Sequence, residues 1–401
     1  MTADNANKQP PRQKISKRAH LPPFMAMDVM RLASEKQAAG EDVIHLEVGQ
    51  PASSAPQAVM EKLVETMAEL SNHGYGLPMG QLALRTRLSQ HYQNWYGLDV
   101  PVERLAITVG SSTAFAISFM AAFDEGDEIA IPVPGYPAYR NLMLGLGLKP
   151  VNIPAGPDEG WMPKLKEMES WDRLPDGLMI ASPHNPTGVI IPPEELGKIA
   201  RWCDEKGVRL ISDEIYHGLN YSGECDSVLR YTKNAIIVNS LSKYFSMTGW
   251  RIGWMIVPEE LVQATERLAQ NLYIAAPTPN QMAAVMAFDC KDELDGHTAR
   301  YKTNREILLS GLSPEFLGNH APCDGAFYLY ADVSALTDDS ITFAAELLEQ
   351  TGVATTPGVD FDPENGHRYL RLSFAGSTQS MHEAVKRING FVETRKVTAA
   401  E

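Results

Sequence analysis

The alternation of helical patterns with short β-branched runs constrains the fold of this 401-residue chain more than any other feature. Between about residues 55 and 290, apolar-periodic stretches are separated by the runs LAITVG, DEIAIPVP, GLMIASP, VRLISDE, AIIVNS and WMIVP. Such alternation predicts a mainly parallel sheet with helices on both faces. We therefore expect residues 55–290 to form a large α/β domain.

The segments on either side of this region show a different pattern. Residues 21–54 contain an apolar-periodic stretch that Gly40 should end, followed by the short strand VIHLEV and a turn at Gly49. From residue 291 onward, long polar helical patterns are mixed with the strands GAFYLYADV and YLRLSFA. We expect residues 21–54 and 291–401 to supply the two parts of a smaller α+β domain. Residues 1–20, which are polar and basic, should form a flexible N-terminal arm.

The charge balance and the cysteines exclude several classes of partner. The chain has 35 Lys and Arg against 50 Asp and Glu, a formal net charge of −15, which repels nucleic acids and anionic membranes. Because of this charge we expect no nucleic-acid partner. We also expect no membrane partner, because no apolar run approaches the roughly 20 residues that span a bilayer. The N-terminus lacks the apolar stretch of a secretory signal, so we place the protein in the cytoplasm. Its four cysteines include no CxxC pair, and no metal site is expected.

Polar residues follow the predicted strands, at the edge where open parallel sheets bind their ligands. After the strand that ends at Gly110, Ser111 and Ser112 begin a helix whose free N–H groups would hold an anion, although ordinary capping explains serines there equally well. In SPHNPTG, Asn185 precedes a proline, which keeps its backbone out of a helix and leaves its amide free for a ligand. A plain turn is the alternative.

Two further motifs contain the residues most suited to catalysis. Asp213 ends a strand that otherwise looks buried, so it needs a donor such as a protonated pyridine nitrogen, or a salt bridge to an arginine. Tyr216 follows it, either as a ligand group or as a core aromatic. In SLSKYFSMTGWRIGW, Lys243 suits Schiff-base chemistry, since burial depresses the basicity of lysine. Arg251 lies between glycines and suits a phosphate, unless both cations are ordinary surface residues.

Together these motifs resemble those of the class I/II aminotransferases, the fold type I group of pyridoxal-phosphate enzymes. The similarity runs in order from Gly49 to about Phe374, and it includes NPTG, SDEIY, SxSK with its trailing arginine, and RLSFA. It implies a large domain with a mostly parallel seven-stranded sheet covered by helices, plus a smaller α+β domain. It also implies pyridoxal 5′-phosphate as cofactor and ping-pong transfer of the amino group of a small α-amino acid to a 2-oxo acid, within amino acid metabolism.

The resemblance implies a role for each residue that contacts the cofactor ring. Lys243 looks like the lysine that forms the internal aldimine and then moves the proton between the substrate and the cofactor. Asp213 resembles the carboxylate that keeps the pyridine nitrogen protonated. Asn185 and Tyr216 look like donors to the phenolic oxygen, and Tyr136 occupies the position of the aromatic that stacks on the ring.

It also implies how the phosphate and the substrate are held. The phosphate would contact Ser111, Ser112, Ser240 and Arg251. Tyr75 resembles the tyrosine that reaches the phosphate bound by the other subunit, which implies a homodimer with shared active sites. For the substrate, Arg371 matches the arginine that grips the α-carboxylate, and Gly49 matches the glycine that lets this carboxylate approach the backbone.

Two departures from the family pattern concern the substrate. The bacterial aspartate-type branch has hydroxyl residues and a lysine where this chain has Phe24, Ala26 and Ser112, which argues against a dicarboxylate. Phe24 and Met27 would line an apolar side-chain pocket or pack against a partner subunit. In PGVDFDPENG, Phe361-Asp362 replaces the usual Phe-Gly; Asp362 would either disfavour acidic substrates at the entrance or cap the next turn.

Two other functions remain open at this level. A carbon–sulfur β-lyase of the same fold would share these motifs, because the outcome depends on which substrate bond stands perpendicular to the cofactor. An aminotransferase-like regulatory module is the second alternative. Such regulators carry a DNA-binding helical domain ahead of the fold, whereas a short polar arm precedes it here.

Overall fold

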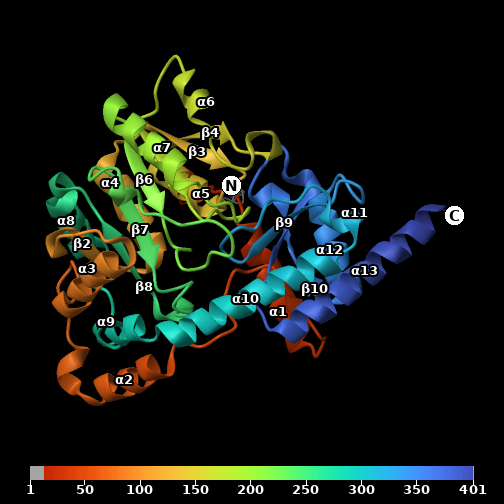
Figure 1. Cartoon of the computed structure of the whole chain (residues 1–401), viewed down its shortest axis with the longest axis horizontal. Helices are drawn as coiled ribbons and strands as arrows, with labels where there is room; N and C mark the ends of the chain where they lie inside the picture. Colours follow the sequence, from red (N-terminus) through yellow and green to blue (C-terminus); the bar gives the residue numbers. More distant parts are fainter. Residues whose placement is uncertain (1–12, 401) are drawn as a thin grey trace, which may run out of the picture.

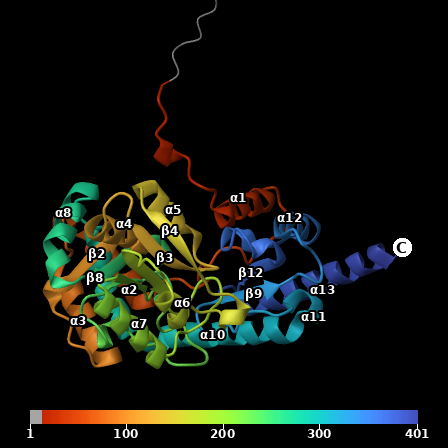
Figure 2. The same cartoon turned by 90° about the horizontal axis from the view of Figure 1, so that it is seen from above.

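The computed structural model describes residues 13–400, with side chains through residue 397. Residues 1–12 of the predicted arm lie outside the described residues. In the remainder of the arm, Lys17–Ala19 form one short 3-10 turn. In Figure 2 this red segment ahead of helix α1 (Met25–Ala38) leads away from the body of the molecule. Helix α1 ends close to Gly40, which has a φ of +94°, as the sequence predicts.

A seven-stranded sheet forms the centre of the larger part of the molecule. Its strand order is β2-β8-β7-β6-β5-β3-β4, and all neighbours are parallel except those of β8. This confirms the predicted fold class, an α/β fold with a mostly parallel sheet covered by helices. The strands are β2 (Leu105–Val109), β3 (Glu128–Val133), β4 (Lys149–Pro154), β5 (Gly177–Ala181), β6 (Arg209–Asp213), β7 (Ile236–Ser240) and β8 (Ile252–Ile256).

Successive strand residues point to opposite faces of this sheet, and different helices cover each face (Figure 1). On β6, Ile211 packs with the helices α4 (Gly110–Ala122), α5 (Pro137–Leu146) and α8 (Val262–Leu272). Its neighbour Leu210 packs with α3 (Leu82–Tyr96) and α7 (Pro193–Lys206) on the other face. The carboxyl ends of the parallel strands are left uncovered by these helices, and the site described below lies there.

Two small sheets belong to the second part of the molecule, which combines the beginning and the end of the chain. β1 (Ile44–His45) pairs in parallel with β10 (Val353–Ala354). The other sheet has the order β11-β12-β9, with β11 (Thr356–Pro357), β12 (Tyr369–Ser373) and β9 (Tyr328–Asp332) all antiparallel. This pairing brings the segment before residue 50 beside strands that lie about 300 residues later in the chain.

The remaining helices surround these sheets. Helix α10 (Lys291–Gly311) runs in Figure 1 from the seven-stranded part toward the C-terminal part, where it packs on α13 (Thr378–Ala400). The others are α2 (Gln57–Ala68), α6 (Leu165–Glu169), α9 (Thr278–Ala284), α11 (Pro314–Leu317) and α12 (Ser340–Thr351). Among the described residues, no helix is both long enough and apolar enough to span a membrane.

Candidate active site

A cavity of about 390 Å³ opens at the carboxyl ends of the sheet strands, between the sheet, helix α1 and the strands β9 and β12. Most of the residues that the sequence singles out lie on its wall. They are Gly49, Ser111, Ser112, Tyr136, Asn185, Asp213, Tyr216, Lys243, Arg251 and Arg371. Segments from the beginning, middle and end of the chain therefore meet at one site.

Two of the residues predicted to bind the cofactor do not line this cavity. Ser240 is buried behind it, where its hydroxyl contacts the Ser242 hydroxyl at 2.7 Å and donates to the Ile252 carbonyl at 3.1 Å. Ser242 lies on the cavity wall instead. Tyr75 is 87% exposed on the outer surface, on the segment between α2 and α3.

Lys243 has the environment of a reactive amine. Its Nζ donates to the Gly49 carbonyl at 2.7 Å and lies 5.7 Å from the centre of the Tyr216 ring. Burial lowers the pKa of the Lys243 ammonium, because the charged form loses hydration. The neutral, nucleophilic amine is thus more accessible here than on a surface lysine.

Asp213 is held beneath the cavity by hydrogen bonds from neutral donors. The Tyr139 hydroxyl donates to Oδ2, and the Ile215 N–H donates to Oδ1 at 3.0 Å. Burial raises the pKa of Asp213 to about 6, against the opposing effect of these donors. It forms no ion pair with an arginine in the described part of the chain, so the salt-bridge alternative is not seen. A buried carboxylate that faces a cavity can accept a hydrogen bond from a protonated ring nitrogen.

Two sources of positive charge meet where strand β2 passes into helix α4. The first N–H groups of α4 have no partner within the helix. Gly110 begins this helix with a φ of +70°, and a Cβ built on it would lie 2.2 Å from Nη2 of Arg251. The guanidinium, which donates through Nη1 to the Thr248 carbonyl at 2.9 Å, therefore packs directly against the helix start. This arrangement suits a phosphate.

Arg371 is a buried cation without an anionic partner among the described residues. Its Nη1 donates to the Asn185 side-chain oxygen at 3.0 Å, and its Nη2 donates to the Glu47 carbonyl. The guanidinium carbon lies 4.4 Å from the Tyr328 ring centre and 4.6 Å from that of Phe361. Its Nε is buried with no hydrogen-bond partner in the same part of the chain. A carboxylate in the cavity would satisfy this charge.

Two tyrosines that the sequence reasoning missed complete the site. Tyr139, in the first turn of α5 and three residues after Tyr136, donates to Asp213. Tyr328 contacts the Tyr216 hydroxyl at 2.9 Å and lies against Gly49. The three-residue spacing between Tyr136, the N-cap of α5, and Tyr139 is a usable signal in the sequence. Tyr328 begins the largely buried strand β9, and nothing in the local pattern distinguishes it from the core residues beside it.

The beginning of α1 forms an apolar wall of the cavity. Phe24, Ala26 and Met27 line it, and the Phe24 ring meets the Tyr136 ring edge-on at 5.7 Å. The pocket-lining alternative for Phe24 and Met27 therefore matches their position in the described chain. Asp360, which the sequence reasoning also missed, receives hydrogen bonds from the first N–H groups of this helix.

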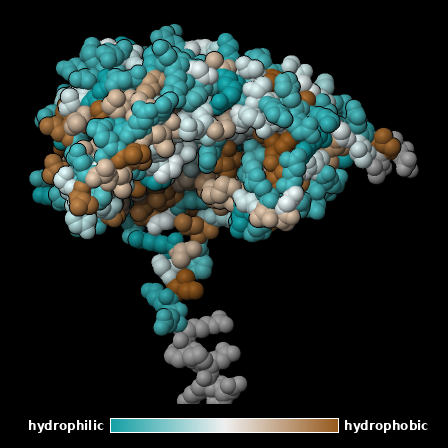
Figure 3. Space-filling model, turned by 90° about the horizontal axis from the view of Figure 1, so that it is seen from below, coloured by the Kyte–Doolittle hydropathy of each residue, from teal (hydrophilic) through white to brown (hydrophobic). Residues whose placement is uncertain are grey.

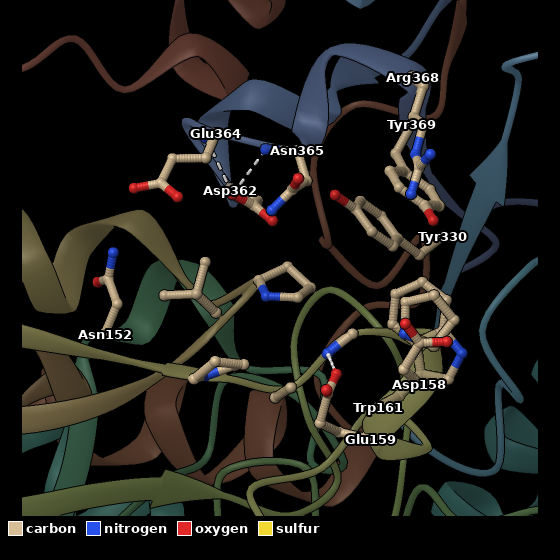
Figure 4. A pocket seen from close by; sticks show the side chains of 16 residues that line it. Asn152, Asp158, Glu159, Trp161, Tyr330, Asp362, Glu364, Asn365, Arg368 and Tyr369 are labelled. Carbon is tan, nitrogen blue, oxygen red and sulfur yellow. Dashed lines mark hydrogen bonds between the residues drawn. The ribbon is translucent and has the colours of Figure 1, made fainter.

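Asp362 does not line the active-site cavity. Its Oδ1 accepts from the N–H groups of Glu364 and Asn365, each at 3.0 Å, so it caps the turn that follows. Figure 4 shows this side chain in a separate groove of about 410 Å³, together with Tyr330 and Arg368. Of the two expectations for Asp362, turn capping agrees with the geometry.

The fold and the site identify a fold type I enzyme. The chain matches the family "Aminotransferase class I and II" over residues 41–388, and it belongs to that family. It is 43% identical to the valine–pyruvate aminotransferase of Mycobacterium tuberculosis over 386 residues, which is 95% of this chain and 99% of the relative. It is 32% identical to the aspartate/prephenate aminotransferase of Thermus thermophilus, covering 91% of this chain and 95% of the relative.

Solved structures agree with this assignment. An aminotransferase from Mycobacterium tuberculosis, 43% identical, superimposes with a TM-score of 0.93 over 96% of this chain and 100% of the other. The aspartate aminotransferase of Thermus thermophilus with maleate is 30% identical and superimposes with a TM-score of 0.88, over 94% of this chain and 100% of the other. The protein is therefore an aminotransferase, and neither the lyase nor the regulatory alternative is favoured.

Proposed function

We propose that this aminotransferase uses pyridoxal 5′-phosphate bound at Lys243 to move the amino group of a small apolar α-amino acid to a 2-oxo acid such as pyruvate. The observation that supports this most directly is the combination around one cavity of Lys243, of Arg371, which has no anionic partner in the described part of the chain, and of the apolar wall of α1. The name of the relative from Mycobacterium tuberculosis supports valine as donor and pyruvate as acceptor.

The chemistry of the cavity fits this cofactor. Arg251 and the start of α4 would bind its phosphate. Arg251 packs so closely on Gly110 that position 110 has no room for a side chain. Asp213 matches its ring nitrogen, and Asn185 and Tyr216 offer donors to its phenolic oxygen. Ser111, Ser112 and Ser242 would add hydroxyls to the phosphate shell, with Ser240 supporting Ser242 from behind.

Each residue would then have one task in amino-group transfer. When bound, pyridoxal phosphate supplies an aldehyde that condenses with amines and a ring that accepts electron density from the substrate Cα. Asp213 holds the proton on the ring nitrogen, and Tyr139 orients Asp213. Lys243, once its Nζ is free, moves the proton away from Cα. Arg371 fixes the α-carboxylate through two-pronged hydrogen bonds, with Asn185 holding the guanidinium in place.

A homodimer with shared sites is part of this proposal. Tyr75 is exposed, although the resemblance assigns it to a phosphate contact in the other subunit. Exposed apolar side chains lie near it in the sequence, on α2, on the segment that follows it and at the start of α3: Met60, Val64, Met67, Leu70, Leu77 and Leu82. Figure 3 shows the face toward which α2 lies, with brown side chains exposed among teal ones. A second copy of the chain would cover these apolar groups and bring Tyr75 to the partner's site.

Two further expectations accompany the proposed function. The division into a large domain of residues 55–290 and a small domain of residues 21–54 and 291–401 stays a prediction. We also propose that the enzyme works in the cytoplasm, which is consistent with four cysteines that are all unpaired in the described part of the chain.

A half-reaction assay tests the proposed function. The purified protein is loaded with pyridoxal phosphate and mixed with each of the twenty amino acids in the absence of any keto acid. Conversion of the cofactor to its amine form, followed by absorbance, is expected with valine and related apolar donors. Added pyruvate should reverse the change and yield alanine. Release of pyruvate and ammonia from a cysteine conjugate without an acceptor would instead indicate the lyase.

A further inference from the structure

Helix α1 begins at the wall of the substrate cavity without a cap of its own. Its N-cap position is Phe24, whose side chain makes no capping hydrogen bond. Asp360 supplies the cap instead: Oδ1 accepts from the Met25 N–H at 3.0 Å, and Oδ2 accepts from the Ala26 N–H at 3.1 Å. A carboxylate at a helix N-terminus also interacts favourably with the helix dipole. One buried side chain, about 335 residues further along the chain, therefore fixes where α1 begins.

The residue after Asp360 contacts the other end of the substrate site. The Phe361 ring lies 4.6 Å from the guanidinium carbon of Arg371. The Phe361 carbonyl accepts from the Gly135 N–H at 3.0 Å, which ties this segment to the large sheet. Two consecutive residues thus connect the cation that would hold the α-carboxylate with the helix that forms the side-chain wall.

We propose that Asp360 is a positioning residue for substrate choice. By holding the first turn of α1, it sets the distance between Arg371 and the wall formed by Phe24 and Met27, and so favours donors with branched apolar side chains over alanine. This inference rests on the proposed function, because it assumes that Arg371 binds the α-carboxylate.

The expected effect depends on the substrate side chain. When Arg371 fixes the carboxylate, the position of α1 decides how well a larger side chain is packed, whereas alanine has only one methyl group to place. A single methylene in an apolar pocket changes kcat/KM by about 10–200-fold. Small shifts of α1 should therefore affect valine much more than alanine.

The test compares Asp360→Asn with Asp362→Asn in the cofactor-loaded enzyme. Asparagine keeps the shape of Asp360 but turns one acceptor oxygen into an NH₂ group that faces a backbone N–H. Loss of a helix cap predicts that kcat/KM for valine falls roughly 5–30-fold, mainly through KM, with less than about a threefold change for alanine. Asp362 is a matched control, because it is also buried and caps two backbone amides of its own loop (Figure 4), and these bonds do not involve α1.

A second variant and a second measurement make the result decisive. Phe24→Ala shortens the wall itself and should lower the valine-to-alanine ratio in the same direction, even if Asp360→Asn folds poorly. Amide hydrogen exchange in the first turn of α1 should accelerate in Asp360→Asn and not in Asp362→Asn. The proposal would be overturned if Asp360→Asn left the valine-to-alanine ratio of kcat/KM unchanged, or if amide exchange in the first turn of α1 did not accelerate. If the wild type transfers from neither donor, the proposed function fails, while the exchange data still show whether Asp360 holds α1.

Discussion

Replacement of Gly49 by alanine tests the geometry of the site most stringently. A Cβ built on Gly49 would lie 1.7 Å from the Tyr328 hydroxyl oxygen, half the 3.4 Å at which ordinary contact begins, and 2.4 Å from Cζ of the same ring. The ring cannot simply turn aside, because its hydroxyl contacts Tyr216 at 2.9 Å and its face packs on Arg371. Overpacking of this kind costs about 1–3 kcal/mol of stability.

The same substitution should also disturb catalysis. The Gly49 carbonyl accepts from Lys243, so a shift of this loop moves the reactive amine as well as Tyr328. A displacement of roughly 1 Å at reacting groups lowers the rate about 10²-fold, which is the fall in kcat/KM that we expect.

Steady-state kinetics and urea unfolding of Gly49→Ala measure the two effects. Gly390→Ala is the matched control, because Gly390 is exposed on α13 and a Cβ added to it would meet no atom within 4 Å. It should retain the activity of the wild type and be at least as stable, since alanine favours a helix more than glycine does. If Gly49→Ala is as active as Gly390→Ala, the reasoning from the Tyr328 contact is wrong.

Three further predictions concern single charged groups. Lys243→Ala should abolish the visible absorption of the bound cofactor and its trapping by borohydride, and an unchanged spectrum would refute the assignment of Lys243. Arg371→Leu should raise KM for every amino acid alike, with a loss of about 2–4 kcal/mol in kcat/KM, whereas a loss confined to one class of donor would show that Arg371 contacts the side chain. Burial raises the pKa of Glu214 to about 8 from its ordinary 4.5. Between these two pH values the folded state keeps a proton that the unfolded state has lost, so the free energy of unfolding falls as the pH rises toward 8. The stability of Glu214→Gln relative to the wild type should therefore rise by about 3 kcal/mol between pH 6 and pH 9 in urea unfolding, and a constant difference would contradict the prediction.

The sequence predicts those parts of the fold whose pattern is local. Six strands of the large sheet follow from short β-branched runs, because buried parallel strands are apolar along their whole length. Strand β4 was missed, since it contains Pro150 and Pro154. It lies at the edge of the sheet, where a missing N–H is tolerated and the apolar pattern is weaker.

The candidate site shows the same division. Lys243 and Asp213 could be predicted as site residues because a charge in a buried segment is costly unless a partner or ligand compensates it. Asp360 gives no such signal, because its partners are the backbone amides of a helix at the other end of the chain. Spacing alone also fails to show that Ser242, and not Ser240, lies on the cavity wall.

The parallel pairing of β1 with β10 has a consequence for the order in which the enzyme is completed during synthesis. The cofactor side of the cavity lies within the strands up to β8, which leave the ribosome long before β12 does. Arg371 and the partner strand of the first segment come only near the end of translation. A growing chain would thus have the groups proposed to bind the vitamin-derived ligand well before it has those proposed to hold an amino acid.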